Sequence, residues 1–250
     1  MKTAMLSLFI LLGAMNLRAQ DPYLLFEQAN QAYKENDFGK AAGLYEDILK
    51  TGLESGEVYY NLGNSYYRMH RPGPARLNYE RAKKYLDDDE ALRQNLELLI
   101  LTLPDQIADP PRLFIAEWWD GLVYALGVRS WGWLSLLLFT ILLGALTAFF
   151  YRKNRGRNLR TDFIRLVSIL WILALIVWLQ RLYLAETEHF AVIMDSSITV
   201  HAEPATNATE LFVLHEGTRV LMERRSGDWE LVRLKDGKTG WLPVKSIEKI

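Results

Sequence analysis

The sequence predicts a multidomain membrane protein with three parts: a set of all-α helical repeats, a hairpin of two transmembrane helices and a C-terminal all-β barrel. Three observations predict this architecture. Residues 22–89 repeat with a period of 34, two apolar runs of membrane-spanning length follow at 131–151 and 163–183, and short strand-like runs occupy 190–250. Such patterns are typical of stacked helix pairs, bilayer spans and antiparallel strands, respectively.

The two central apolar runs predict a transmembrane hairpin. Residues 131–151 carry no charge, and at about 1.5 Å per residue such a helix just spans a hydrocarbon core of about 30 Å. Residues 163–183 form the second expected span, with Arg165 and Arg181 near its ends, where long side chains reach the interface. One span plus a buried core helix is the alternative, which the length of the second run disfavours.

Charge around the hairpin predicts its orientation. The loop at 152–162 is rich in arginine and lysine, and short loops of this kind stay on the cytoplasmic side of a membrane. Residues 1–19 combine an early Lys2 with an apolar segment and a candidate cleavage site after Ala19, which predicts a secretory signal peptide or, alternatively, an uncleaved anchor. Both signals place the helical repeats and the β-domain on the outer face.

The charge totals exclude several classes of function. The chain holds 29 basic and 30 acidic residues, and both predicted outer parts are net negative, with 16 acids and 11 bases in residues 20–113 and 11 acids and 8 bases in residues 185–250. A nucleic-acid-binding patch is not needed to explain the basic loop. Because the chain has no cysteine, thiol nucleophiles, disulfides, thiolate metal sites and a lipid-modified cysteine are excluded.

The helical part consists of two copies, 22–55 and 56–89, and a closing amphipathic helix at 90–103. In the alignment of the copies, small residues pair with small ones and aromatic residues with aromatic ones, as in Ala29 with Gly63 and Tyr45 with Tyr79. The copies resemble the tetratricopeptide repeat, a helix-turn-helix unit of this length. The matching positions are Tyr59, Leu62, Gly63, Tyr66, Ala75, Tyr79 and Ala82 in the second copy, and Ala29, Asp37, Phe38, Ala41 and Tyr45 in the first.

This resemblance implies a groove that binds peptides, lined by the first helix of each pair. Asn64 and Arg68 lie one helical turn apart and can contact a peptide backbone or a carboxylate. A plain solvated polar face is the alternative interpretation of the same side chains. The candidate groove residues are Asn30, Lys34, Asn61, Asn64 and Arg68.

Residues 104–130 connect the repeats to the first span. Residues 104–112 contain three prolines and predict a helix-breaking linker. Residues 114–127 are aromatic but include Glu117 and Asp120, so they are too polar to span and suit a helix in the membrane interface. A short helix buried against the repeats is the competing interpretation.

The last sixty residues predict a small β-barrel. Strand-like runs at 191–194, 198–201, 211–214, 219–222, 229–234 and 240–243 alternate with turns, including Asp236-Gly237. The motifs VHAEP (200–204), LFVLHEGTRV (211–220), GDWELVRL (227–234) and GKTGWLP (237–243) resemble the bacterial SH3-like domain. Trp229 and Trp241 are the candidate residues of a peptide- or glycan-binding surface, although either ring can instead fill the core.

No catalytic or metal-binding pattern stands out. The histidines His70, His189, His201 and His215 form no HExxH pair, and GxSxG and P-loop motifs are absent. The four acids at 87–90 are consecutive, so they cannot all face one metal ion. We therefore expect a protein that is not an enzyme, with no catalytic residue, no bound metal and no cofactor.

The order of the parts resembles the BatE family of the Bacteroides aerotolerance operon. That resemblance implies a bacterial inner-membrane scaffold or adaptor in an aerotolerance or envelope-stress complex. It implies as partners the membrane proteins with von Willebrand factor A domains of the same operon, linked to a MoxR-type AAA+ ATPase. The alternative function is binding or sensing of peptidoglycan in the cell wall.

Overall fold

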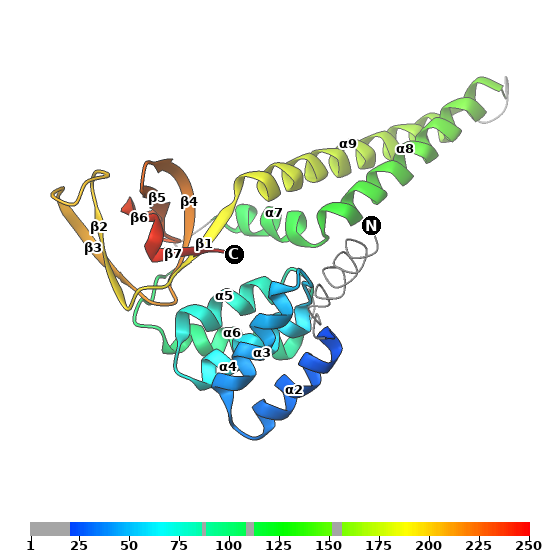
Figure 1. Cartoon of the computed structure of the whole chain (residues 1–250). Helices are drawn as coiled ribbons and strands as arrows, with labels where there is room; N and C mark the ends of the chain where they lie inside the picture. The colour runs from blue at the N-terminus through cyan, green and yellow to red at the C-terminus, as the bar shows by residue number, and fades with distance from the viewer. Residues whose placement is uncertain (1–20, 87–88, 109–112, 152–156) are drawn as a thin grey trace, which may run out of the picture. The chain divides into compact units, whose positions relative to one another are not determined.

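A computed structural model describes residues 21–86, 89–108, 113–151 and 157–250 (Figure 1). Two compact units are present: one combines the residues up to 108 with residues 190–250, and the other consists of residues 109–189. The predicted signal peptide, 1–19, and residues 152–156 of the predicted basic loop lie outside the described residues.

The first unit begins with helices that confirm the predicted period. The first helices of successive pairs, α2, α4 and α6, start at Pro22, Gly56 and Glu90, and these starts are evenly spaced by one repeat period. The second helices, α3 and α5, start at Phe38 and Pro72, which are separated by the same interval. Thus α6 occupies the place of a first helix in a third repeat. The bounds are α2 Pro22–Lys34, α3 Phe38–Lys50, α4 Gly56–Arg68, α5 Pro72–Ala82 and α6 Glu90–Thr102.

Aspartates begin three of these helices, and a continuous core joins all five. The side chains of Asp21, Asp37 and Asp89 each accept a hydrogen bond from a backbone N–H in the first turn of α2, α3 and α6, which satisfies donors that the helix leaves unpaired.

The core consists of small residues where the helices cross and larger side chains between them. It includes Ala29, Ala41, Tyr45, Leu62, Ala75, Tyr79, Leu92 and Leu99.

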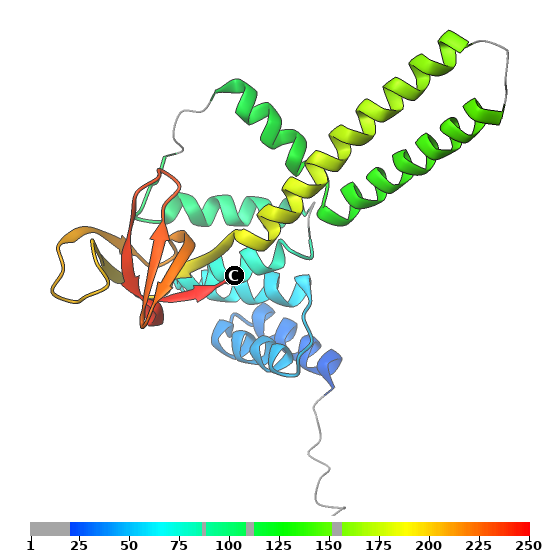
Figure 2. The same cartoon turned by 90° about the horizontal axis from the view of Figure 1, so that it is seen from above.

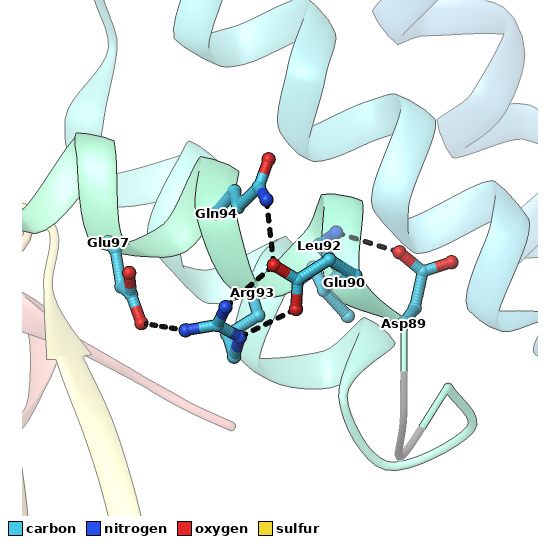
Figure 3. A network of polar contacts seen from close by, with 6 residues as sticks. All are labelled: Asp89, Glu90, Leu92, Arg93, Gln94 and Glu97. Carbon is cyan, nitrogen blue, oxygen red and sulfur yellow. Dashed lines mark hydrogen bonds and ion pairs between the residues drawn. The ribbon is translucent and has the colours of Figure 1, made fainter.

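A network of charged side chains lies on α6 (Figure 3). Arg93 is the counterpart, one repeat period later, of Tyr59, and Glu97 is the counterpart of Gly63, which packs against α5 in the preceding repeat. The Arg93 guanidinium donates to Glu90 at 2.6 and 2.9 Å and to Glu97 at 2.8 Å. A polar outer face of this kind is typical of the end of a stack of repeats, so it is compatible with the prediction that α6 closes the stack.

The described residues of the second unit form three helices, α7 Phe114–Tyr124, α8 Val128–Tyr151 and α9 Arg157–Thr187. The stretches Val128–Tyr151 and Thr161–Thr187 are long and apolar enough to cross a membrane. Only 11% and 17% of their most apolar stretches are buried, so neither is the enclosed core helix that was the alternative expectation. Figures 1 and 2 show α8 and α9 running side by side as a hairpin.

Helix α7 packs against the hairpin. Val123 is fully buried together with Trp131, Ala174 and Val177, and the indole N–H of Trp119 donates to Gln180 at 2.9 Å. Three large apolar side chains of α7 are exposed: Phe114, Ile115 and Trp118 are 76%, 61% and 67% exposed. This combination suits the predicted membrane-interface helix.

Seven strands form one open antiparallel sheet in the order β3-β2-β6-β5-β4-β1-β7, so the predicted all-β domain is present as an open sheet and not as the closed barrel that we expected. All six predicted strand-like runs overlap with observed strands, and Asp236-Gly237 forms the predicted turn, with Gly237 at φ +90°. The short last strand was not predicted. The bounds are β1 His189–Ile193, β2 Ser197–His201, β3 Glu210–His215, β4 Arg219–Ser226, β5 Trp229–Arg233, β6 Thr239–Pro243 and β7 Ile247–Lys249.

Polar contacts join the helical repeats to the sheet within the first unit. The carboxylate of Asp105 accepts hydrogen bonds from the backbone N–H of His215 at 2.7 Å, from the His215 ring at 2.8 Å and from the Thr218 hydroxyl at 2.5 Å. On α5, Arg76 donates to the carbonyl of Gly217 at 2.8 Å, and Arg81 donates to that of Lys249 at 2.7 Å. The sequence predicts the repeats and the sheet as separate modules and gives no sign of this junction.

Candidate functional site

A network of asparagines and tyrosines joins the first helices of the repeats. The Tyr45 hydroxyl of α3 donates to Oδ1 of Asn30 in α2 at 2.6 Å, and Nδ2 of Asn61 in α4 donates to the same oxygen at 3.3 Å. Burial raises the pKa of Tyr45 to about 12, despite an opposing contribution from Asn61. The phenol is therefore neutral and able to donate at physiological pH.

The same arrangement recurs one repeat later. The Tyr79 hydroxyl donates to Oδ1 of Asn64 at 2.7 Å, and Nδ2 of Asn95 in α6 donates to that oxygen at 3.0 Å. Each participant lies one repeat period after its counterpart in the first copy, so the network has the period of the chain. Because both Oδ1 atoms already accept two hydrogen bonds, the Nδ2 groups of Asn30 and Asn64 are the donors that can meet a ligand.

The predicted groove residues divide into two groups. Asn30, Asn61 and Asn64 are half-buried; a hydrogen bond joins Asn61 to Asn30, and Asn64 belongs to the equivalent set one repeat later. Lys34 and Arg68 are exposed in the last turns of α2 and α4. The Arg68 guanidinium lies 4.4 Å from the centre of the Phe38 ring, so this cation borders the amide network and does not form part of it.

Three apolar side chains on the same side of the first helices are not among the residues predicted from the sequence. Tyr67, Leu98 and Leu101 are 36%, 54% and 72% exposed. Leu98 follows Asn64, and Leu101 follows Tyr67, by one repeat period each. That periodicity is the signal in the sequence that could have found them, because it places residues 90–103 in register with α4. We refer to Asn30, Asn61, Asn64, Tyr67, Asn95, Leu98 and Leu101 as the repeat face.

The two tryptophans of the sheet differ from each other. Trp241 is only 7% exposed and lies opposite His201 in the β2–β6 pairing, with the Arg224 guanidinium 5.4 Å from its ring. Neighbouring side chains therefore cover most of the Trp241 ring, which fits the alternative expectation that this ring fills the core. Trp229 is half-buried, and its ring meets the edge of His201 at 5.5 Å, so part of this candidate stays accessible.

The groups on the repeat face can form hydrogen bonds and apolar contacts with a ligand. The repeat face combines amide donors, exposed apolar side chains and two bordering cations, which suits an extended peptide with apolar side chains. Among the described residues, no group of three or more histidine, aspartate or glutamate side chains is placed to hold a metal ion.

Comparison of the chain with protein-family models finds no model that matches it. Comparison with curated proteins also finds no match.

Proposed function

We propose that this chain is a non-enzymatic scaffold whose helical repeats bind an extended peptide segment of a partner protein. The observation that supports this best is the repeat face, where amide donors that recur with the period of the repeats stand beside the exposed Leu98 and Leu101. The helix spacing and the packing of small residues against aromatic ones fit the tetratricopeptide family, and the motifs of the sheet fit an SH3-like domain.

The same proposal places the protein in a bacterial inner membrane as a two-pass protein, with the repeats and the sheet in the periplasm. Two helices long enough to span a bilayer and the basic loop between them support this topology. Reporter fusions at Asn158 and Ile250 test it, since an exported signal at Asn158 or a cytoplasmic one at Ile250 would contradict it.

The order of the parts supports partners like those of the BatE family. These are membrane proteins with von Willebrand factor A domains, linked to a MoxR-type AAA+ ATPase in an aerotolerance or envelope-stress complex. The expected cytoplasmic loop is short, so contact with an ATPase is relayed through such membrane partners.

Peptide binding is tested on the full-length protein in detergent, because the repeats share polar contacts with the sheet. Overlapping peptides are immobilised that cover the periplasmic parts of von Willebrand factor A proteins encoded beside this chain. Binding of the full-length protein to each peptide is measured by biolayer interferometry. Leu101→Ser is expected to weaken binding about tenfold or more, since burying a leucine stabilises by about 1.5–3 kcal/mol. Leu53→Ser, at an exposed leucine outside the repeat face, is the matched control. Equal binding by both variants, or no binding peptide, would contradict the proposal.

A second candidate function is binding of peptidoglycan by the β-sheet. Leu211 and Val213 on β3 are each 48% exposed, and Trp229 keeps part of its ring accessible. Co-sedimentation of the full-length protein with purified sacculi tests this, and Trp229→Ala is expected to reduce it. Sedimentation that does not exceed that of a detergent-solubilised control protein would remove this candidate.

A further inference from the structure

The half of the helical hairpin next to α7 contains an apolar groove of about 640 Å³ between α8 and α9. Its walls are mostly large side chains, including Trp133 and Leu136 from α8 and Trp171 and Trp178 from α9. The helices approach closely beside it, since a Cβ atom on Gly132 would lie 3.0 Å from the indole nitrogen of Trp178. This volume is within the range of specific ligand sites, about 300–1,000 Å³.

The groove has the length of one leaflet of a bilayer. It begins at Val128 and Arg129, at the N-terminal end of α8, and extends to Phe139, whose ring lies 5.2 Å from that of Trp171. The helical segment from Arg129 to Phe139 rises about 15 Å, which is about half of a 30 Å hydrocarbon core. A site that ends near the midplane fits an acyl chain better than a partner helix, which would cross both leaflets.

The composition of the walls favours the same occupant. Surfaces that pack against other transmembrane helices are enriched in small residues, whereas tryptophan, phenylalanine and leucine dominate this groove. At its mouth, Arg129 is exposed, and no ion pair found in the described part of the chain involves it. A cation at the level of the headgroups attracts a negatively charged lipid.

We infer that this groove binds one acyl chain of an anionic phospholipid of the outer leaflet, with the lipid phosphate beside Arg129. The inference rests on the membrane insertion proposed above. The lipid would then be bound specifically to the end of the hairpin where α7 packs, unlike the surrounding bilayer lipids, which exchange rapidly.

The test uses full-length protein reconstituted into phosphatidylcholine vesicles with a small fraction of spin-labelled phosphatidylglycerol or spin-labelled phosphatidylcholine. Electron paramagnetic resonance then measures the fraction of each lipid that the protein immobilises. The wild type is expected to prefer phosphatidylglycerol by roughly fivefold, the preference that one cation near the membrane surface provides. Arg129→Gln is expected to abolish the preference, whereas Arg165→Gln, at the other end of the hairpin, is expected to keep it.

Two further variants test the groove itself. Leu136→Trp fills it and is expected to reduce immobilised phosphatidylglycerol, while Leu137→Trp alters the neighbouring position outside the groove and is expected to have no effect. Circular dichroism melting confirms that each variant is folded. Equal immobilisation by Arg129→Gln and wild type, or by the two tryptophan variants, would overturn the inference. A dimer lost only in Leu136→Trp, with unchanged lipid, would assign the groove to a second copy and also overturn it.

Flotation separates the two levels of the proposal. Protein that does not float with the vesicles would contradict membrane insertion and, with it, the lipid site. Protein that floats but shows no preference for phosphatidylglycerol would overturn the lipid site alone.

Discussion

A Cβ atom added to Gly63 of α4 would lie 2.6 Å from Cδ1 of Tyr79 and 2.7 Å from its Cε1. The Tyr79 side chain is fully buried in the core, so the surrounding side chains restrict any movement of its ring. The close approach of α4 and α5 therefore depends on a position without a side chain, although glycine is otherwise a poor residue for a helix interior.

Gly63→Ala is accordingly expected to destabilise the protein by about 1–3 kcal/mol, the usual cost of overpacking a core. Gly43→Ala is the matched control, since it also lies inside a helix but a Cβ there meets nothing within 4 Å. That change is expected to stabilise by up to about 1 kcal/mol, through helix propensity. Chemical denaturation in detergent measures both. A stabilising Gly63→Ala would show that the ring can move aside.

The amide network is expected to contribute to stability as well as to binding. Asn64→Ala removes the acceptor of the buried Tyr79 hydroxyl and of Asn95, and leaving such groups unpaired costs about 1–3 kcal/mol. A lowered melting temperature is the expected result. Asn207→Ala, in an exposed turn of the sheet, is the control, and an equally small effect of the two changes would argue against a structural role of the network.

Asp105 is expected to make the protein less stable at acid pH than at neutral pH. Burial by itself would raise the pKa of Asp105, but the hydrogen bonds from Thr218 and His215 outweigh it and hold the pKa below its ordinary value. Stability from the charged carboxylate is thus complete above the ordinary pKa of about 4 and is lost as the pH falls through the lower, folded-state value.

Asp105→Asn should therefore lower the melting temperature at neutral pH, and the difference from wild type should shrink as the pH falls below about 4. Asp236→Asn is the control: its pKa is also lowered, by Lys238, but it lies in a surface turn and joins no elements. Melting curves across this pH range test the prediction. A difference in melting temperature between Asp105→Asn and wild type that stays the same at all pH values would contradict it.

The charge of Glu230 on β5 is expected to destabilise the protein at neutral pH, in contrast to that of Asp105. Its side chain is 9% exposed, and burial raises its pKa against the smaller influence of Arg225. A raised pKa in the folded state means that stability falls as the pH rises from the unfolded-state value through the folded-state value, and that the penalty persists above it.

Glu230→Gln should consequently raise the melting temperature at neutral pH and lose this advantage below about pH 4, where the carboxyl group is protonated in both states. The exposed Glu210→Gln should have little effect at either pH. A Glu230→Gln variant less stable than wild type at pH 7 would indicate that its charge makes a favourable contact.

The network around Arg93 should matter less for stability than its number of contacts suggests (Figure 3). Arg93, Glu90 and Glu97 have side chains that are 59%, 62% and 58% exposed, and exposed ion pairs contribute about 0–1 kcal/mol. Arg93→Ala is therefore expected to change the free energy of unfolding only slightly, because solvent screens these exposed charges. A marked decrease in the free energy of unfolding, measured by denaturation, would mean that the network contributes substantially to the stability of the repeats.

The elements that the sequence predicted best are those defined by short-range patterns. The spacing of Ala29, Gly63, Tyr45 and Tyr79 predicted helix pairs at a period of 34, and the observed helix starts confirm it. Alternating runs between turns predicted six of the seven strands. Each pattern depends on the local geometry of the backbone, which repeats along the chain and so leaves a periodic trace in the sequence.

The sequence by itself also determined the two long apolar helices and the basic segment between them, because bilayer length and charge are properties of contiguous residues. Only the tertiary structure decided that Trp241 is covered while Trp229 is partly accessible, and that Asp105 joins the segment after α6 to His215 and Thr218. The residues of such contacts lie far apart along the chain, in this case about 110 positions. No periodicity connects them, because contact between distant segments depends on how the whole unit packs.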